Sequence, residues 1–315
     1  MKKTILLLVA LTIARIECSF AQDFTIGVIP DWQKLTYQGT HGAQQMKNIT
    51  QWFVDHKKEL NVVFVASLGD MTQGTFNATN YSADQWKRNT EALGILRSNG
   101  IPFSPCQGNH DPYVAINKYF PASYFENEPY WGGSLNGKIE NSYYKFEAAG
   151  MKFILLTTQW AKSSSVNSWA DKILKENSDR RAIFVSHSGL SQIVTNDTYL
   201  VDAIVRKHDN IFLGLMGHLC ETGGEENWTT VSAGGNTQRL IRTDYQCQYV
   251  NGEPASIVRY YTFKPEEDRV YAHTYDLRAQ AWVTNNSSQF SFHYDMEPAD
   301  KQGAEKQRSE PISKP

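Results

Sequence analysis

Polar residues with metal-binding side chains follow five separate apolar segments of this sequence. Each segment is short, rich in aliphatic and aromatic residues, and typical of a buried strand. In open α/β sheets, ligands bind beyond the carboxyl ends of the strands, so these side chains are expected to meet at one edge. The residues that follow the segments are Asp31, Asp70, Asn109 with His110 and Asp111, His187, and His218.

These residue types suit one kind of chemistry. Carboxylate and amide oxygens, together with imidazole nitrogens, form donor sets for divalent metals such as Fe, Zn and Mn. A single Gly-Asp after a strand usually marks a turn, and a single His is usually structural. Several such endings in one chain, with Asn, His and Asp consecutive at 109–111, are much more specific. The sequence therefore predicts a metal site, and the lack of a Gly-x-Ser-x-Gly motif argues against a serine hydrolase.

In their order along the chain, the motifs resemble those of the calcineurin-like metallophosphoesterase superfamily. That family's pattern is Asp-x-His, Gly-Asp, Gly-Asn-His-Asp/Glu, a further His, and Gly-His-x-His. The matching residues lie between about residues 24 and 275, nearly the whole chain after its N-terminal segment. The resemblance implies a fold of the α/β (α+β) class, a four-layer α/β/β/α sandwich of two mixed sheets flanked by helices.

The resemblance also implies a cofactor of two divalent metal ions, which could be Fe, Zn or Mn. Asp70 would bridge the two ions, and Asp31 would bind the first. The second ion would be bound by Asn109, His187 and His218.

The resemblance implies catalytic roles for two further residues. His110 would lie beside the substrate phosphate, with its ring held by Asp111. Metal-activated water would attack the phosphorus atom in line, while His110 stabilises charge or protonates the leaving oxygen. No nucleophile from the protein is needed.

Two positions depart from the family pattern, and both belong to the first metal. Gln33 replaces the His of Asp-x-His, and Cys220 replaces the last His of Gly-His-x-His. The chain resembles an exported branch of the superfamily that shares these departures and carries a later Asp-Tyr-Gln, here residues 244–246. Because an amide oxygen is a poorer ligand for zinc or iron than imidazole, we expect the first ion to bind weakly.

The role of Cys220 has three alternatives at this point. Its thiolate could bind the metal, it could form a disulfide with Cys247, or it could be an inert buried thiol. The neighbouring Glu221 could supply an oxygen ligand instead. The sequence does not choose among these.

Alternating strands and helices position these residues. We expect strands at 24–30, 61–66, 102–106, 142–148, 152–158, 181–186 and 210–216, and helices at 44–60, 83–97, 167–176 and 199–207. Beyond residue 217 the pattern changes to strands alone, at 229–232, 256–263 and 269–275. This order predicts two sheets packed face to face with helices outside.

The ends of the chain predict an exported protein. Residues 1–21 have the charged, apolar and cleavable order of a signal peptide, 22–296 form the metallophosphoesterase domain, and 297–315 form a polar, disordered tail. No later segment is long and apolar enough to span a membrane. The expected location is extracellular or periplasmic. N-glycosylation is predicted at Asn-x-Ser/Thr sequons, namely Asn48, Asn77, Asn80, Asn196, Asn227, Asn285 and Asn286.

Charge and motifs together define the expected function. The formal net charge is -2 and no basic run occurs, so nucleic acid is not expected as an electrostatic partner. The sequence predicts a secreted, metal-dependent enzyme that hydrolyses a small phosphomonoester or phosphodiester. The alternative is a degenerate member that binds a phosphorylated ligand without turnover. The sequence indicates neither the substrate nor an oligomeric state.

Overall fold

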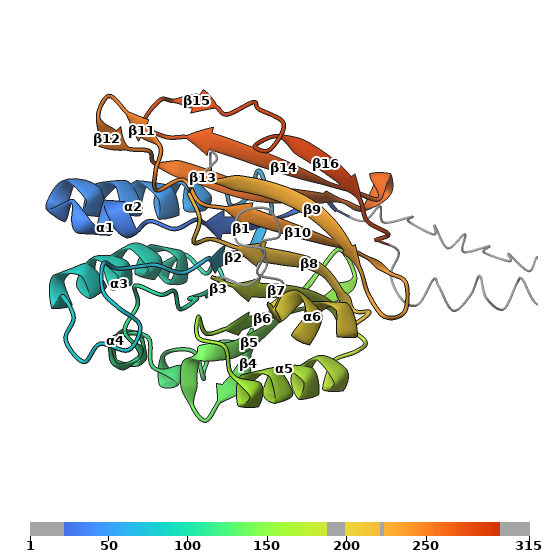
Figure 1. The fold of residues 1–315 in the computed structure, drawn as a ribbon. Helices are drawn as coiled ribbons and strands as arrows, with labels where there is room; N and C mark the ends of the chain where they lie inside the picture. Colours follow the sequence, from blue (N-terminus) through green and yellow to red (C-terminus); the bar gives the residue numbers. More distant parts are fainter. Residues whose placement is uncertain (1–21, 188–198, 221–223, 297–315) are drawn as a thin grey trace, which may run out of the picture.

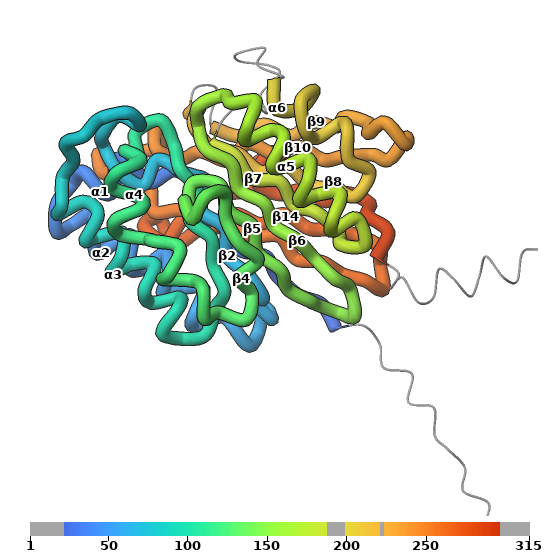
Figure 2. Tube along the Cα trace, turned by 90° about the horizontal axis from the view of Figure 1, so that it is seen from below, coloured from blue at the N-terminus to red at the C-terminus, as the bar shows by residue number. Residues whose placement is uncertain are grey.

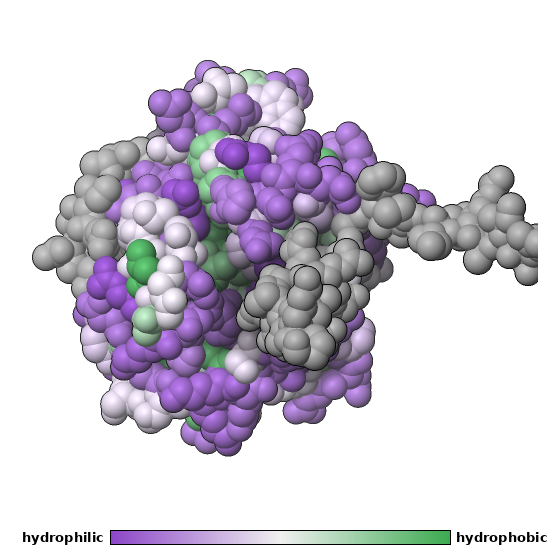
Figure 3. All heavy atoms as spheres, turned by 90° about the vertical axis from the view of Figure 1, so that its right-hand side faces the viewer, coloured by the Kyte–Doolittle hydropathy of each residue, from purple (hydrophilic) through white to green (hydrophobic). Residues whose placement is uncertain are grey.

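The computed structural model describes residues 22–187, 199–220 and 224–296. The predicted signal peptide at 1–21 and the predicted disordered tail at 297–315 lie outside the described residues, and so does Glu221. Within the described part of the chain, no helix is both long and apolar enough to cross a membrane. The face shown in Figure 3 is largely hydrophilic, with hydrophobic side chains confined to small areas.

The first sheet has seven strands and mixes parallel with antiparallel pairs. Strands β1, β2 and β3 run parallel, whereas β13 runs antiparallel to β1, with Gly27 opposite Tyr260. In spatial order the strands are β15 (Ala281–Trp282), β14 (Arg269–Asp276), β13 (Ile257–Lys264), β1 (Phe24–Ile29), β2 (Val62–Ser67) and β3 (Phe103–Ser104), and β16 (Phe290–His293) also pairs with β14.

The second sheet also has seven strands and is also mixed. Its central strands β6, β7, β8 and β10 run parallel, and the outer pairs are antiparallel. The spatial order is β4 (Trp131–Leu135), β5 (Lys138–Ala148), β6 (Met151–Thr158), β7 (Arg181–Ser186), β8 (Ile211–Met216), β10 (Thr237–Thr243) and β9 (Glu225–Val231). A small hairpin of β11 (Tyr249–Val250) and β12 (Glu253–Pro254) lies beyond β10 in the sequence.

Alternating side chains of the second sheet feed two different cores. In β6, Phe153 and Leu155 belong to the large core shared with the first sheet, whereas Ile154 and Leu156 pack with α5 and α6. Successive residues of a strand point to opposite faces, so a strand buried on both faces reads as a continuous apolar run. The two sheets therefore pack against each other, with helices on the outside (Figure 1).

Helices cover both outer faces, as Figures 1 and 2 show. On the side of the first sheet these are α1 (Gln33–Tyr37), α2 (Gly39–Asp55), α3 (Ala83–Ser98) and α4 (Tyr113–Tyr119), and on the other side α5 (Ser164–Glu176) and α6 (Tyr199–Ala203). Ser82 and Ser163 begin α3 and α5 as N-caps, accepting hydrogen bonds from the amides of Gln85 and Val166. The predicted arrangement of two mixed sheets flanked by helices is confirmed.

The expected elements differ from the structure in two places that matter for the site. The helix expected at 44–60 begins at residue 39 and ends at 55, and the short helix α1 precedes it. Strand β10 was not expected, because buried polar residues such as Gln238 and Arg242 interrupt its apolar pattern. This strand carries the Asp-Tyr-Gln segment to the edge where the other strands end.

Candidate active site

The carboxyl ends of parallel strands from both sheets meet at one edge and deliver the polar side chains. Asp31 and Asp70 follow β1 and β2 of the first sheet, and His187 and His218 follow β7 and β8 of the second. Because the two sheets pack face to face, ligands from each sheet lie side by side.

Asp70 and His187 lie in direct contact at the centre of the site. His187 Nε2 is 3.0 Å from Asp70 Oδ2 and 3.1 Å from the side-chain oxygen of Asn109. The other ring nitrogen, Nδ1, donates to the carbonyl of Leu68 at 2.7 Å. A carbonyl can only accept, so this bond fixes Nδ1 as the protonated nitrogen and leaves Nε2 for a metal.

His218 completes this group. Its ring nitrogen, the Asp70 carboxylate and His187 offer ligand atoms that all lie within 4.8 Å of one another. The ring packs against Trp160, with centroids 4.4 Å apart. Asp70 and His218 adopt left-handed backbone conformations, with φ of 47° and 78°. Such conformations are costly for residues with a Cβ and are characteristic of functional sites.

The electrostatics of this centre match a cation site. Burial opposes the charged forms of both residues, but the Asp70 carboxylate still raises the pKa of His187, and His187 lowers the pKa of Asp70. The oxygens of Asp70 and Asn109 thus favour a positive charge at this position. A divalent metal would supply that charge more effectively, and the mixed nitrogen and oxygen donors fit Zn, Fe or Mn.

Two glycines make the close approach possible. A Cβ at Gly108 would lie 2.1 Å from Asp70 Oδ1, and one at Gly69 would lie 2.7 Å from His187 Nδ1. Gly69 also has a φ of +95°, which side-chain-bearing residues rarely adopt. The Gly-Asp and Gly-Asn-His-Asp motifs therefore carry glycine because the backbone must pass directly beside the ligands.

His110 lies at the edge of the same centre, but the predicted partner of its ring is wrong. The backbone N–H of His110 donates to Asp70 Oδ1 at 2.8 Å, and its Nδ1 bonds to the carbonyl of Gly74, also at 2.8 Å. Because a carbonyl oxygen can only accept, Nδ1 carries a proton in this bond, and Nε2 is the nitrogen that can exchange a proton with a substrate. His110 is half-buried and keeps its predicted place beside the metal ligands.

Asp111 has a structural task in place of the predicted contact with the His110 ring. Its fully buried carboxylate accepts hydrogen bonds from the amides of Met71, Thr72 and Gly108 at 2.9–3.0 Å, and from the Thr72 hydroxyl. Asp111 thereby joins the loop after β2 to the loop after β3. It is a positioning residue for Asp70 and Asn109, because its oxygens are occupied by backbone donors.

A second set of donors lies on the other side of Asp70. Asp31 accepts a hydrogen bond from the backbone N–H of Gln33 at 3.0 Å and another from Gln246 Nε2 at 2.8 Å. The same Gln246 nitrogen lies 3.2 Å from Asp244 Oδ2. Both carboxylates are buried. Burial raises the pKa of Asp31 well above its usual value, and the neighbouring charges of Asp244 and Asp70 raise it further. Burial also raises the pKa of Asp244, to about 6.

We name the two sides by their donors. The imidazole half consists of Asn109, His187 and His218, and the carboxylate half consists of Asp31, Asp244 and Gln246. Asp70 contacts His187, and beyond the effect of burial its charge raises the pKa of Asp31 and of Asp244. The predicted ligand Gln33 reaches the carboxylate half through its backbone N–H. A metal contact of the Gln33 side chain stays a prediction.

Cys220 is joined to Cys247 in a disulfide, with Cα atoms 5.5 Å apart. Of the three alternatives for this residue, the structure has the disulfide, so Cys220 offers no thiolate and its predicted role as a metal ligand is wrong. The third cysteine within the described residues, Cys106, is buried and free. The disulfide ties the loop of His218 to the segment that carries Gln246.

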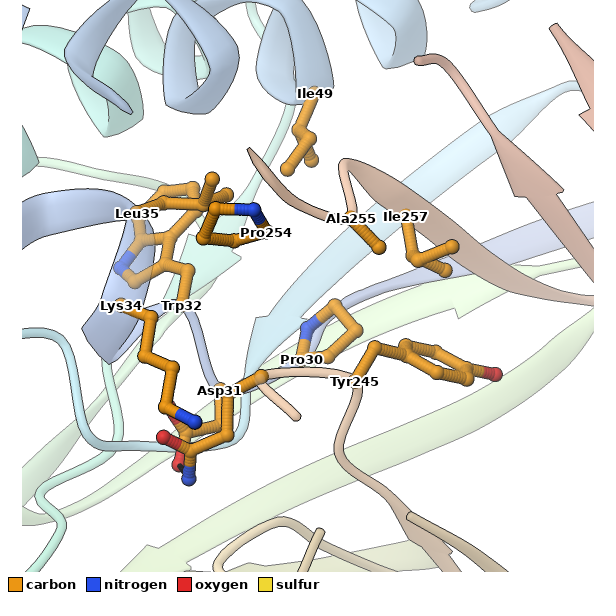
Figure 4. Close-up of a pocket in the computed structure, with 11 residues that line it drawn as sticks. Pro30, Asp31, Trp32, Lys34, Leu35, Ile49, Tyr245, Pro254, Ala255 and Ile257 are labelled. Atoms are coloured by element: carbon orange, nitrogen blue, oxygen red, sulfur yellow. Dashed lines mark hydrogen bonds between the residues drawn. The ribbon is translucent and has the colours of Figure 1, made fainter. Parts of the chain in front are cut away.

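A pocket adjoins the carboxylate half (Figure 4). Asp31 and Lys34 lie together at one end of the pocket, and Gln246 also lines it. The apolar lining residues are Pro30, Trp32, Leu35, Ile49, Pro254, Ala255 and Ile257. The Lys34 ammonium group lies 3.6 Å from Cys247 Sγ. Tyr245 extends away from Asp31 in this view.

Comparisons with known proteins agree with this geometry. The sequence profile of the calcineurin-like phosphoesterases (Metallophos) matches residues 24–221. Because this match covers more than half of the chain, the chain belongs to the calcineurin-like phosphoesterase family. Members of this family typically depend on two metal ions, and the residues of the imidazole half fit one of them.

Similar proteins do not specify a substrate. The uncharacterized protein YvnB of Bacillus subtilis (strain 168) is 26% identical over 271 residues, which cover 79% of this chain and 20% of that protein. The chain therefore spans about a fifth of the length of this relative. Among solved structures, GAP50, the anchor in the inner membrane complex of Plasmodium, is 10% identical with a TM-score of 0.46 and covers 87% of this chain and 89% of its own. A Vps29 single mutant from Entamoeba histolytica is 12% identical with a TM-score of 0.33 and covers 87% of this chain and 100% of its own.

The structure brings together the predicted ligands and adds residues that the sequence reasoning missed. From the sequence, Asp244 and Gln246 indicate only a resemblance to the exported branch, although Asp-Tyr-Gln contains two side chains that can bind a metal. Trp160 follows β6 as the predicted ligands follow their strands, and its backbone N–H donates to the side chain of Gln107 at 2.8 Å. Asp244 follows strand β10 in the same way, so a strand expected at 237–243 is the signal that would identify Asp244 as a site residue.

Proposed function

We propose that this protein is an exported, metal-dependent phosphoesterase that hydrolyses a small phosphomonoester or phosphodiester. The observation that carries the proposal is the convergence of Asp70 Oδ2 and the Asn109 side-chain oxygen on His187 Nε2, at 3.0 and 3.1 Å, with His110 bonded to Asp70 through its backbone N–H. These donor atoms fit a metal. A loop with only a structural role would not require a histidine at position 110.

The residues divide the chemical work. Metal ions bound here would bind phosphoryl oxygens and lower the pKa of a water molecule. The His110 amide and His187 hold the Asp70 carboxylate in place. His110 Nε2 is free to donate a proton to the leaving oxygen, since Nδ1 is engaged by Gly74. Asp111 keeps the two ligand-bearing loops in register.

The proposed location outside the cytoplasm is supported by the Cys220–Cys247 disulfide, because disulfides persist mainly in oxidising compartments. The predicted signal peptide and glycosylation sites agree with such a location.

The test is hydrolysis of p-nitrophenyl phosphate and bis(p-nitrophenyl) phosphate by purified protein. Chelator-treated protein should be inactive, and added Mn²⁺ or Zn²⁺ should restore turnover of at least one ester. The His187→Ala variant should stay inactive at the same metal concentrations, and Asp276→Asn, a buried carboxyl outside the site, should behave as the unmodified protein.

The alternative, a degenerate member, has one specific observation in its favour. The position of the family's last His is taken by Cys220, which is held in a disulfide and cannot bind a metal. Phosphate binding by the metal-loaded protein without hydrolysis of either ester would support this alternative and contradict the proposed enzyme.

A further inference from the structure

The first metal of the family pattern lacks two of its usual ligands in this chain. Cys220 is in a disulfide, and Gln33 contributes a backbone N–H to Asp31. Asp31 and Asp70 alone would leave a divalent ion with two protein ligands. If the site binds a metal, other side chains must supply the missing donors.

Asp244 and Gln246 are placed to do so. Asp244 is fully buried, Asp31 is 4% exposed, and both carboxylates surround the same amide nitrogen of Gln246. Two buried carboxylates this close repel each other, and burying charge without a counter-charge is costly. The Gln246 NH₂ group therefore occupies the place where a positive charge would stabilise both. Rotation of this amide would present its oxygen to an ion there.

The fold holds the Asp-Tyr-Gln segment in this position by contacts on both sides of the chain. Before it, the Asp244 N–H donates to the carbonyl of Gly224 at 2.8 Å. Within it, the buried Tyr245 hydroxyl donates to Glu225 at 2.5 Å, and Glu225 also pairs with the buried Arg259 at 3.3 Å. After it, Cys247 is tied to Cys220. A segment fixed at three points is well suited to present ligands in a set geometry.

We propose that Asp244 and Gln246 complete the first metal site, together with Asp31 and Asp70, as an all-oxygen site selective for a hard divalent cation such as Mn²⁺. This inference rests on the proposed metal-dependent function and adds the identity of the ligands and of the ion.

The donor chemistry gives the selectivity. Carboxylate and carbonyl oxygens favour Mg²⁺, Ca²⁺ and Mn²⁺, whereas imidazole favours Zn, Fe and Cu. The carboxylate half contains only oxygen donors, and the imidazole half contributes two nitrogen donors from His187 and His218. Zn²⁺ binds most sites more tightly than Mn²⁺, so the difference depends on metal supply: limiting Zn²⁺ should occupy the imidazole half, and Mn²⁺ in excess should occupy the carboxylate half.

The experiment measures bound metals directly. Chelator-treated protein is equilibrated with one equivalent of Zn²⁺ and an excess of Mn²⁺, separated from free metal and analysed by elemental mass spectrometry, and Mn²⁺ binding is followed by electron paramagnetic resonance. The unmodified protein should hold about one Mn and one Zn. Asp244→Asn should weaken Mn²⁺ binding by about 10–100-fold or more, since even indirect partners of a metal ligand change affinity by this amount. It should keep its Zn, which also shows that the variant is folded.

Matched variants separate the possible failures. Gln246→Ala, at a half-buried position, should weaken Mn²⁺ binding in the same direction, and Asp276→Asn should leave both metals unchanged. His187→Ala should lose Zn and keep Mn. If Asp244→Asn and Gln246→Ala both bind Mn²⁺ as tightly as the unmodified protein, this inference is wrong while the proposed function stands. If the unmodified protein binds neither metal, the proposed function itself fails.

Discussion

The two halves of the site use different donors and are anchored in different ways. In the imidazole half, His187 is oriented by the carbonyl of Leu68, and His218 packs against Trp160. In the carboxylate half, Asp31 and Asp244 share the Gln246 amide, and a disulfide holds the segment that follows. The first half keeps the family's ligands unchanged. The second has Gln33 and Cys220 where the family pattern has two His residues, and its proposed replacement donors, Asp244 and Gln246, follow strand β10.

Under the proposed function, this difference explains how a two-metal site could form without the two His residues that the family pattern has at positions 33 and 220. Several parallel strands end at the same edge of a sheet, so a side chain after one strand can take the position of a ligand that follows a neighbouring strand. Cys220 lies after β8 and Asp244 follows β10, and these two strands are parallel neighbours in the second sheet. Substitutions at Asp70, at His110 and at the disulfide test whether the two halves are distinct.

The largest effect is expected from Asp70→Asn, because Asp70 is the proposed ligand shared by the two halves. Both ions should be lost or strongly weakened, and hydrolysis should fall by about 10⁴-fold or more, equivalent to about 5 kcal/mol of transition-state stabilisation. Metal analysis alongside the rate measurement checks this. Full retention of both metals in the variant would show that Asp70 is not a shared ligand.

Replacement of His110 should affect turnover and leave both halves loaded. His110→Ala removes the proton-exchanging nitrogen without removing a metal ligand, so the rate should fall by about 10²–10⁴-fold. Metal content should match the unmodified protein. An unchanged rate would contradict the assignment, and loss of metal would show that His110 is part of the metal site.

Breaking the disulfide should weaken only the carboxylate half. In the Cys220→Ser, Cys247→Ser double variant, Mn²⁺ affinity should fall by about 10-fold, because partners outside the ligand set orient the ligands. Zn²⁺ affinity should be unchanged. The disulfide closes a loop with a sequence separation of 27, so its removal should also cost about 3–4 kcal/mol of folding stability. Cys106→Ala, at the free buried thiol, is the control for thiol chemistry.

The stability of the metal-free protein should depend on pH. Burial raises the pKa of Asp111 and of Asp244 to about 6. The folded protein thus holds protons that the unfolded chain releases near pH 4, and stability falls as pH rises from about 4 to about 6, by roughly 2 kcal/mol for each group. Asp31 acts in the same direction. Asp70, whose pKa is lowered by His187 against the effect of burial, acts in the opposite sense at lower pH.

Thermal unfolding of chelator-treated and metal-loaded protein at about pH 4.5 and 6.5 measures this dependence. Bound cations stabilise the ionised carboxylates, so the difference in melting temperature between the two forms should grow with pH. A difference that shrinks over this range would mean that the buried carboxyls are not neutralised by metal.

Much of the fold could be predicted from the sequence because its central strands are buried on both faces. The apolar runs before Asp70, His187 and His218 identify β2, β7 and β8 directly. The imidazole half could be predicted for the same reason, since each of its ligands follows such a run or the Gly-Asn-His-Asp motif.

The carboxylate half could not be predicted in full. Strand β10 contains the buried polar residues Gln238 and Arg242, which hide its apolar period, so Asp244 was not recognised as the end of a strand. The partner of the His110 ring is a backbone carbonyl, that of Gly74, and no side-chain pattern indicates such a contact. The Cys220–Cys247 pairing depends on the tertiary approach of two loops, which the spacing of the cysteines does not reveal.

The most direct test of two chemically distinct halves is anomalous X-ray diffraction from crystals of the protein loaded with one equivalent of Zn²⁺ and an excess of Mn²⁺. Maps measured at the absorption edges of both elements should place Zn between His187 and His218, and Mn between Asp31 and Asp244. The same element at both positions, or an ion on the Asp31 side that is not in contact with Asp244, would contradict the account.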